Sequence, residues 1–184
     1  MKSTDLLLED HKHLIAASNI LAAMVVCSEG GQMVSEADVT DLLRFLDEFG
    51  DRHHQGIEEG LLFPALLLDP GQKHYQRLCG LIFEHERQRS LIEGLHDCLL
   101  TRNSKDFIYY ASRLGEVLKA HIKDEEETLF SLVESSLSAA DDERLELEMK
   151  SYDKAWQESE LNVQLRRLAD MELKYLEAPT ERSA

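Results

Sequence analysis

Apolar residues recur along most of the chain every three or four positions, with charged and polar residues between them. This spacing places the apolar side chains on one face of an α-helix, and no stretch alternates apolar and polar residues as a strand would. Short breaks such as SEGG, LDPGQ and TRNS divide the pattern into long segments. The predicted helices run from an N-cap at Ser3 or Thr4 to SEGG, from an N-cap at Ser35 to LDPGQ, from about Lys73 to Leu100 and from about Lys105 to Leu137.

Four long helices with short connections predict an all-α fold, an up-down antiparallel four-helix bundle. A polar segment from Asp141 to about Leu176 keeps the helical spacing and meets few helix breakers before Pro179, which predicts an additional C-terminal helix. We therefore expect a bundle domain over residues 1–138, a C-terminal helix over 139–177 that packs on the bundle or a partner, and a flexible tail over 178–184.

Composition and charge narrow the classes of partner. With 20 Lys and Arg against 36 Asp and Glu, the formal net charge is −16, which disfavours nucleic-acid binding. The longest apolar runs, ILAAMVVC and LLFPALLL, are far shorter than the ~20 residues of a membrane-spanning helix, and MKSTDLLLED lacks the apolar region of a signal peptide. The three cysteines form no C-x-x-C pair, so a disulfide framework is not expected. These features predict a cytoplasmic protein without a membrane or nucleic-acid partner.

Two helices carry a histidine with a glutamate four residues later, directly before an apolar run. His54 and Glu58 occur in HHQGIEEGLLFPAL, and His121 and Glu125 in HIKDEEETLF. Residues four apart lie on one helix face with Cβ atoms ~5–6 Å apart, so one metal ion can contact both. The spacing alone is weak evidence, but the similar phrases EEGLLFPAL and EEETLFSLV strengthen it. Gly56 costs a helix ~1 kcal/mol relative to Ala and is expected to leave room for a neighbouring helix.

The other two helices each offer one histidine behind an acidic residue on a largely apolar stripe. These are His11 in LLLEDHKHLI and His85 in LIFEHERQRSLI. In a bundle, one histidine from each of four helices and a glutamate from two of them can converge at one depth. Imidazole and carboxylate ligands suit iron, manganese, zinc or copper, and two glutamates can bridge two ions that each take two histidines. Each ion then keeps an open position.

Other polar residues near these motifs have more ordinary interpretations. His13 competes with His11 on the first helix, but His11 fits the spacing better. Glu126 and Glu127 are expected to be solvated, whereas Glu59 is either solvated or an extra ligand. Four histidines lack partners at the right spacing and are expected at the surface or beside the ligands: His13, His53, His74 and His96.

Together, DLLLEDHKHLI, FGDRHHQGIEEGLLFPAL, LIFEHERQRSLI and HIKDEEETLF resemble, in order and spacing, the hemerythrin-like cation-binding family, which is named for its His-His-Glu (HHE) motif. The resemblance covers about residues 4–135 and implies a hemerythrin-like bundle with a non-haem di-iron centre bridged by two glutamates. The implied cofactor is two iron ions, with zinc or manganese as substitutes. The implied metal ligands are His11, His54, Glu58, His85, His121 and Glu125.

Two departures from the family pattern bear on function. Where relatives read His-His-Gly-Lys-Glu-Glu, this chain reads HQGIEE over residues 54–59, so only His54 keeps the ligand register. Oxygen-carrying hemerythrins place a second histidine four residues from the one on the third helix, but this chain has Leu81 and Arg89 there. Oxygen storage is therefore not expected. Arg89, if it turns inward, would bring a fixed positive charge and hydrogen-bond donors to an anionic ligand, which makes it a candidate ligand-binding residue.

These features support three functional hypotheses. The leading one is a di-iron protein that binds or senses a small ligand such as oxygen, peroxide or nitric oxide. The second is a di-iron enzyme that detoxifies nitric oxide or peroxide, or repairs iron centres, because repair proteins resemble this bundle. The third is a metal-stabilised signalling or interaction module, with the C-terminal helix as the seam for a homodimer or a protein partner. Metal content separates the third hypothesis from the others, and nitric oxide turnover separates the second from the first.

Overall fold

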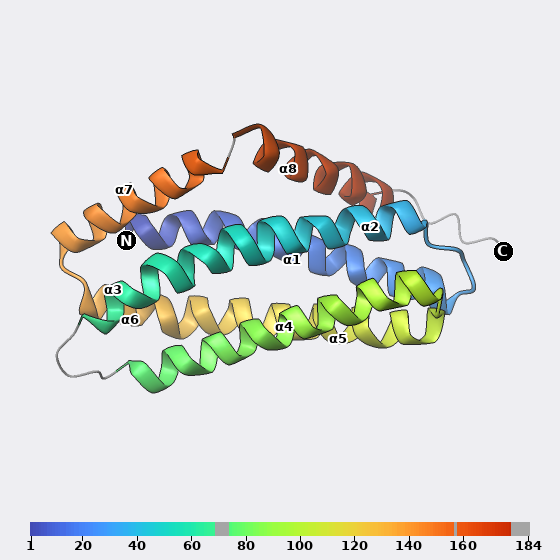
Figure 1. Ribbon diagram of the computed structural model, residues 1–184, viewed down its shortest axis with the longest axis horizontal. Helices are drawn as coiled ribbons and strands as arrows, with labels where there is room; N and C mark the ends of the chain where they lie inside the picture. Colours follow the sequence, from blue (N-terminus) through green and yellow to red (C-terminus); the bar gives the residue numbers. More distant parts are fainter. Residues whose placement is uncertain (69–73, 157, 178–184) are drawn as a thin grey trace.

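The chain folds into long helical rods (Figure 1). The computed structural model describes residues 1–68, 74–156 and 158–177, and the described residues contain no strand. The four rods, in which η denotes a π-helix, are α1 (Lys2–Glu29); α2 (Glu36–Phe45) with η1 (Leu46–Gln55), η2 (Glu58–Leu62) and α3 (Phe63–Leu67); α4 (Tyr75–Thr101); and α5 (Ser104–Asp124) with η3 (Glu125–Leu129) and α6 (Phe130–Ser136). Two further helices follow, α7 (Ala139–Ala155) and α8 (Glu158–Glu172), and then η4 (Leu173–Glu177).

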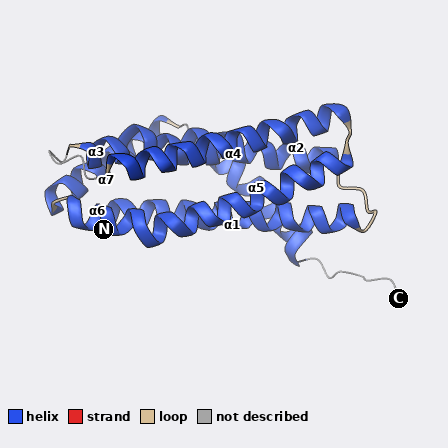
Figure 2. Ribbon diagram, turned by 90° about the horizontal axis from the view of Figure 1, so that it is seen from below, coloured by secondary structure: helices blue, strands red, loops and turns tan. Residues whose placement is uncertain are grey.

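The rods run alternately up and down, which confirms the predicted four-helix bundle. α1 packs against α5, α5 against α4, and α4 against α2, and each of these neighbours runs in the opposite direction (Figures 1 and 2). Because all four rods extend along the same axis, side chains from distant parts of the sequence meet at one depth inside the bundle.

The apolar core is divided into two clusters. One includes Leu14 and Phe45 and fills the half of the bundle that contains α2, while the other includes Leu7 and Leu62 and fills the half that contains α3 and α6. Leu7 and Leu14 belong to different clusters although both lie on the inner face of α1. His11 is buried between them on the same helix. The polar residues that the sequence singled out therefore lie where the two apolar clusters meet.

The first helix begins earlier than the sequence suggests. α1 begins at Lys2, so the expectation that Ser3 or Thr4 caps it is wrong. Both residues are buried in the first turn, and the carboxylate of Asp142 on α7 accepts hydrogen bonds from the backbone N–H groups of Lys2 and Ser3. A long-range carboxylate thus satisfies the helix start that a local side chain was expected to cap.

The other predicted boundaries agree better with the structure. Ser35 occupies the N-cap position of α2, as predicted. Within TRNS, the side chain of Asn103 accepts hydrogen bonds from the backbone N–H groups of Lys105 and Asp106 and caps α5. Arg102 has a positive φ of 53°, the left-handed conformation that ends many helices.

The predicted C-terminal helix is two helices, α7 and α8. Trp156 has extended backbone (ψ 109°) and ends α7, although no proline or glycine is close by in the sequence. α7 packs on α1 and places Leu145 and Met149 in the cluster that contains Leu7, whereas α8 packs on α1 and α2 and places Leu168 in the other cluster. The break lets consecutive helices cover both halves of the bundle. The predicted tail, 178–184, lies outside the described residues.

A membrane-spanning helix was not expected. Among the described residues, no helix combines the length and the apolar character needed to cross a membrane.

Candidate metal centre

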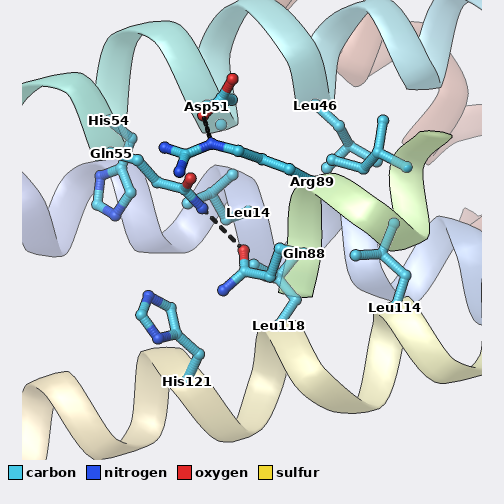
Figure 3. A pocket seen from close by; sticks show the side chains of 12 residues that line it. Leu14, Leu46, Asp51, His54, Gln55, Gln88, Arg89, Leu114, Leu118 and His121 are labelled. Atoms are coloured by element: carbon cyan, nitrogen blue, oxygen red, sulfur yellow. Dashed lines mark hydrogen bonds and ion pairs between the residues drawn. The ribbon is translucent and has the colours of Figure 1, made fainter. Parts of the chain in front are cut away.

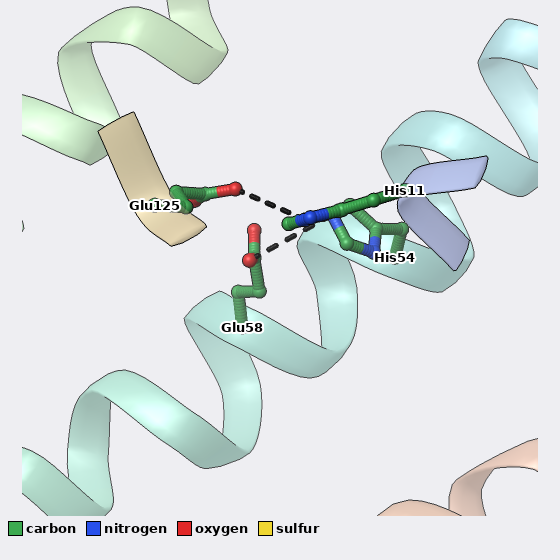
Figure 4. Close-up of side chains that lie close together, drawn as sticks. All are labelled: His11, His54, Glu58 and Glu125. Carbon is green, nitrogen blue, oxygen red and sulfur yellow. Dashed lines mark ion pairs between the residues drawn. The ribbon is translucent and has the colours of Figure 1, made fainter. Parts of the chain in front are cut away.

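Six buried residues from all four rods meet inside the bundle. They form two groups, and within each group the candidate ligand atoms lie within 4.8 Å of one another. Glu58 and Glu125 belong to both groups, and neither side chain is exposed to solvent. The two groups are His11, His54, Glu58 and Glu125, drawn in Figure 4, and Glu58, His85, His121 and Glu125. These are the six residues that the sequence proposed as ligands.

Each histidine directs its Nε2 atom toward the shared carboxylates. The distances to a glutamate oxygen are 3.3 Å from His11 to Glu125, 3.7 Å from His54 to Glu58, 3.3 Å from His85 to Glu58 and 3.2 Å from His121 to Glu125. The Nε2 atoms of His85 and His121 are themselves only 3.1 Å apart. Four ring nitrogens and two carboxylates thus face one small volume.

Many of these atoms lie close to one another but make no hydrogen bond within the described part of the protein. Among the described residues, the buried atoms without a hydrogen-bond partner include Nε2 of His11 and His54 and all the carboxylate oxygens of Glu58 and Glu125. Buried polar atoms are normally satisfied, because leaving one unpaired costs free energy. Two cations that share the two glutamates as ligands would satisfy all of these atoms. The residues present therefore fit a two-metal site.

The outward-facing Nδ1 atom of each histidine meets a different carboxylate. Because an ionised carboxylate only accepts hydrogen bonds, Nδ1 carries the proton and Nε2 is left as the metal-binding atom. Each of these carboxylates comes from a neighbouring rod. We call the four the carboxylate clamps: Glu126 at 3.0 Å from His11, Asp10 at 3.3 Å from His54, Glu59 at 2.6 Å from His85 and Glu84 at 2.8 Å from His121.

The charges of the site change its acid–base behaviour. Burial by itself lowers the pKa of His54, but the charge of Glu58 and the hydrogen bond to Asp10 raise it to about 9. Burial likewise opposes the charge of His121, yet Glu125 and Glu84 raise its pKa to about 10. Burial also opposes the charge of Glu125, but the adjacent histidines, His121 first, hold its pKa well below its usual range. Without metal, the centre is therefore a network of buried ion pairs.

The local backbone is unusual at both glutamates. Glu58 begins the π-helix η2 and Glu125 begins the π-helix η3, each five residues long. π-helical turns are rare and are often found at functional sites. Each turn leads directly to a phenylalanine that stacks on a histidine of the other half of the chain. Phe63 lies 6.0 Å from the ring centre of His85, and Phe130 lies 5.7 Å from that of His11.

These features repeat in the two helical hairpins, the first of α1 to α3 and the second of α4 to α6. An acid precedes the α1 histidine, His11, and another precedes the α4 histidine, His85. Another acid directly follows each shared glutamate, and a phenylalanine lies five residues after that glutamate. The contacts repeat as well, since the acid before each of these histidines clamps the histidine of the other rod in its own hairpin. The centre therefore has an approximate internal two-fold symmetry.

A small cavity adjoins the centre. It has a volume of about 10 Å³, which is room for about one water molecule. His54 and His121, one from each group, contribute to its wall together with Arg89 (Figure 3). The guanidinium of Arg89 donates to the carboxylates of Asp51 at 2.6 Å and Glu59 at 2.8 Å, and also to Glu86. Arg89 thus lines the cavity while its nitrogens are paired with acids, and its predicted contact with a ligand stays a prediction.

The other histidines lie outside the two groups. His13 is half-buried against Phe49, His74 pairs with Ser136, and His96 is exposed beside Asp47. His53 is buried and shares Asp10 with His54, so it lies beside the ligands as expected.

The clamps are the functional residues that the sequence interpretation missed. Glu126 is exposed, as expected, but its carboxylate also contacts His11, and Glu59 is half-buried, contacts His85 and is not one of the six. Glu127 is exposed, as expected, and pairs with Lys123. A signal was present in the sequence, because every clamp is the immediate neighbour of a residue in the two groups.

Comparison with known proteins agrees with this geometry. The family model described as Hemerythrin HHE cation binding domain matches residues 2–133. Neither the curated proteins nor the solved structures include a significant match. The matched region contains all six residues of the two groups and ends within α6, before the two C-terminal helices. This chain therefore belongs to the hemerythrin HHE cation-binding domain family.

Proposed function

We propose that the chain binds two iron ions through His11, His54, Glu58, His85, His121 and Glu125, and that it uses this centre to bind or sense a small ligand such as oxygen, peroxide or nitric oxide. The observation that carries the proposal is the sharing of Glu58 and Glu125 by two four-residue groups. Shared carboxylates are what bridges between two ions require.

The donor set supports the choice of metal. Each group offers two imidazole nitrogens and two carboxylates and contains no cysteine, a combination that suits iron, with zinc or manganese as substitutes. When bound, the metal pair supplies redox chemistry and open coordination positions to a small ligand. The carboxylate clamps fix the orientation of the four rings, and burial excludes bulk water from Glu58 and Glu125.

The surroundings of the centre favour a small ligand, and they favour a role other than oxygen storage. A cavity of about 10 Å³ admits a diatomic molecule far more readily than an organic substrate. Leu81 is fully buried in an apolar cluster and offers no ligand atom where an oxygen carrier has an additional histidine. Arg89 lines the cavity, but Asp51, Glu59 and Glu86 already pair with its guanidinium, so Arg89 places no strong demand on the charge of the ligand.

Metal analysis tests the proposal. Protein purified anaerobically from iron-replete cells should contain two iron ions per chain, and His54→Ala or Glu125→Ala should remove most of the metal. His74→Ala and His96→Ala are matched controls that should retain it, because both residues lie outside the two groups. One ion per chain, or zinc alone after anaerobic iron reconstitution, would contradict the bridged iron centre. Nitric oxide turnover under reducing conditions would identify an enzyme rather than a binding protein.

A further inference from the structure

Two buried glutamines lie beside the metal centre. Gln55 is 5% exposed and Gln88 is 3% exposed, and the Gln55 amide nitrogen donates a hydrogen bond of 2.9 Å to the Gln88 amide oxygen. Within the described part of the chain, the remaining polar atoms of the pair, Oε1 of Gln55 and Nε2 of Gln88, have no hydrogen-bond partner. The pair therefore leaves one buried acceptor and one buried donor unused.

Both glutamines line the cavity that adjoins the centre. In Figure 3 the amide nitrogen of Gln88 is turned toward the side on which His54 and His121 lie. Those two histidines belong to different groups, so the cavity borders both candidate metal positions. Apolar side chains such as Leu14 and Leu118 form much of the remaining wall. A molecule at the centre that extends into this cavity would meet the unused donor of Gln88.

The internal symmetry shows that packing does not require amides at these positions. Gln88 lies three residues after His85, and the equivalent position after His11 is Leu14. Gln55 follows His54, and the equivalent residue after His121 is Ile122. Leu14 and Ile122 are as deeply buried as the glutamines, at 2% and 3% exposure. The same two places in the bundle are therefore filled by apolar side chains in one half and by a polar pair in the other.

Burying unpaired amide groups is unfavourable, because they lose hydrogen bonds to water without full replacement. Apolar residues of similar size would avoid this cost. We propose, on the basis of the proposed function, that the Gln55–Gln88 pair is a ligand subsite. In this subsite Gln88 Nε2 donates a hydrogen bond to the outer atom of a diatomic ligand held at the metal centre. The ligand class is a small molecule with a lone pair on its outer atom.

The subsite makes the two sides of the centre different. Arg89 lines the same cavity, but acids already engage its guanidinium, whereas Gln88 retains an unused donor that is deeply buried. Gln55 orients Gln88 through the hydrogen bond between them and is thus a positioning residue. A bound diatomic molecule would receive its hydrogen bond from an uncharged group, in an otherwise largely apolar cavity.

The test uses nitric oxide as the probe on full-length, ferrous-loaded protein. The double variant Gln55→Ile/Gln88→Leu copies the residues of the other half of the bundle. The single variant Gln88→Met removes the donor with little change in volume. Gln164→Leu is the matched control, since Gln164 is also buried with an unpartnered side-chain oxygen but lies on α8, away from this cavity. Metal content, melting temperature, the infrared N–O stretch in H₂O and D₂O, and the nitric oxide release rate are measured for each protein.

The parent and Gln164→Leu should show an N–O stretch that shifts in D₂O. The double variant and Gln88→Met should bind the same amount of metal, lose the D₂O shift and release nitric oxide about fivefold faster, as expected for one lost hydrogen bond. The double variant should also melt at the same or a higher temperature, since it removes both unpaired amide groups from this cavity. An unchanged N–O stretch and an unchanged nitric oxide release rate in the metal-loaded variants would overturn the subsite but not the proposed function. A lowered melting temperature with unchanged nitric oxide binding would do the same. Absence of iron from the parent would overturn the proposed function as well.

Discussion

At each candidate ligand histidine, one ring nitrogen faces the centre while the other is hydrogen-bonded to a carboxylate from a neighbouring rod. This arrangement fixes the tautomer and the orientation of the ring, and the negative charge makes Nε2 a better donor to a metal. The clamps themselves are partly exposed, with 31% to 41% exposure for the side chains of Glu59, Glu84 and Glu126. They connect a fully buried centre to the surface.

Replacing a clamp should weaken metal binding without removing it. Glu126→Gln should lower metal affinity by about 10- to 100-fold, because the side chain keeps its size but no longer carries the charge that supports His11. Metal affinity can be measured by competition with a chelator of known affinity. Glu127→Gln is the matched control, since Glu127 is the adjacent, exposed residue and pairs only with Lys123 among the described residues. Equal effects of the two substitutions would contradict the role assigned to Glu126.

The six residues of the two groups could be predicted from the sequence, but their clamps could not. Spacing of four residues places His54 and Glu58 on one helix face whatever the details of the bundle. The role of Glu126 depends on the π-helical turn at Glu125 and on the position of His11, which comes from a rod distant in sequence. In the run KDEEE, helix periodicity alone therefore did not identify which acids reach a histidine. The unused amides of Gln55 and Gln88 were likewise visible only in three dimensions.

At the scale of elements, α7 is fitted closely to the second rod. A Cβ atom on Gly56 would lie 2.6 Å from the hydroxyl oxygen of Tyr152, which donates a hydrogen bond of 2.9 Å to the backbone oxygen of Arg52. This contact confirms the expectation that Gly56 makes room for a neighbouring helix. The helix that approaches belongs to the C-terminal segment, and it contacts the rod between the candidate ligands His54 and Glu58.

Gly56→Ala should therefore destabilise the protein, by about 1–3 kcal/mol, because the new methyl group clashes with Tyr152. The loss can be measured by chemical denaturation. Adding Tyr152→Phe should recover part of the stability, since it removes the atom in closest contact. Gly60→Ala, in the same rod but with nothing within 4 Å of the added Cβ, should be neutral or slightly stabilising. If Gly56→Ala and Gly60→Ala behaved alike, the close approach of α7 would be contradicted.

The rods were predictable because their apolar periodicity is long and regular. The changes within them were not. The π-helical turns at Glu58 and Glu125 leave no distinct mark in the apolar pattern, and the break at Trp156 occurs without proline or glycine. The start of α1 at Lys2 depends on Asp142, which no local rule connects with it. Local sequence therefore predicted where helices form, and tertiary contacts decided how they bend, stop and begin.

At the scale of the whole molecule, a metal bound at the centre would compete with protons for the same buried atoms. In the metal-free protein, protonated His54 and His121 stabilise the fold through their carboxylate partners, because their folded pKa values of about 9 and about 10 exceed the ordinary value of 6.5. This contribution is fully present below pH 6.5 and is lost as the pH rises through the folded values. Glu125 behaves oppositely, since its lowered pKa stabilises the fold above 4.5 and the contribution is lost in acid.

Chelation should therefore lower the melting temperature more at pH 10 than at pH 7. In the chelated protein at pH 7, protonated histidines replace the metal as the positive partners of Glu58 and Glu125. At pH 10 these histidines have lost much of their positive charge, so the metal-free centre is less stable. Calorimetry with and without chelator at both pH values measures the difference, and in buffers of different ionisation enthalpy it should detect proton release on metal binding at pH 7. Glu125→Ala, which should bind little metal, provides the control. An equal chelator effect at both pH values would contradict the prediction.

The internal two-fold symmetry also points to how the bundle could have evolved. The first hairpin contains His11, His54 and Glu58, and the second contains His85, His121 and Glu125, so each hairpin contains two histidines and one carboxylate. This is the smallest set that commonly holds a single non-haem iron ion. Duplication and fusion of one ancestral metal-binding hairpin would produce such a bundle directly, with the glutamate of each copy shared across the new interface. The amide pair, which is present in one half only, would then be a change made after the two copies diverged.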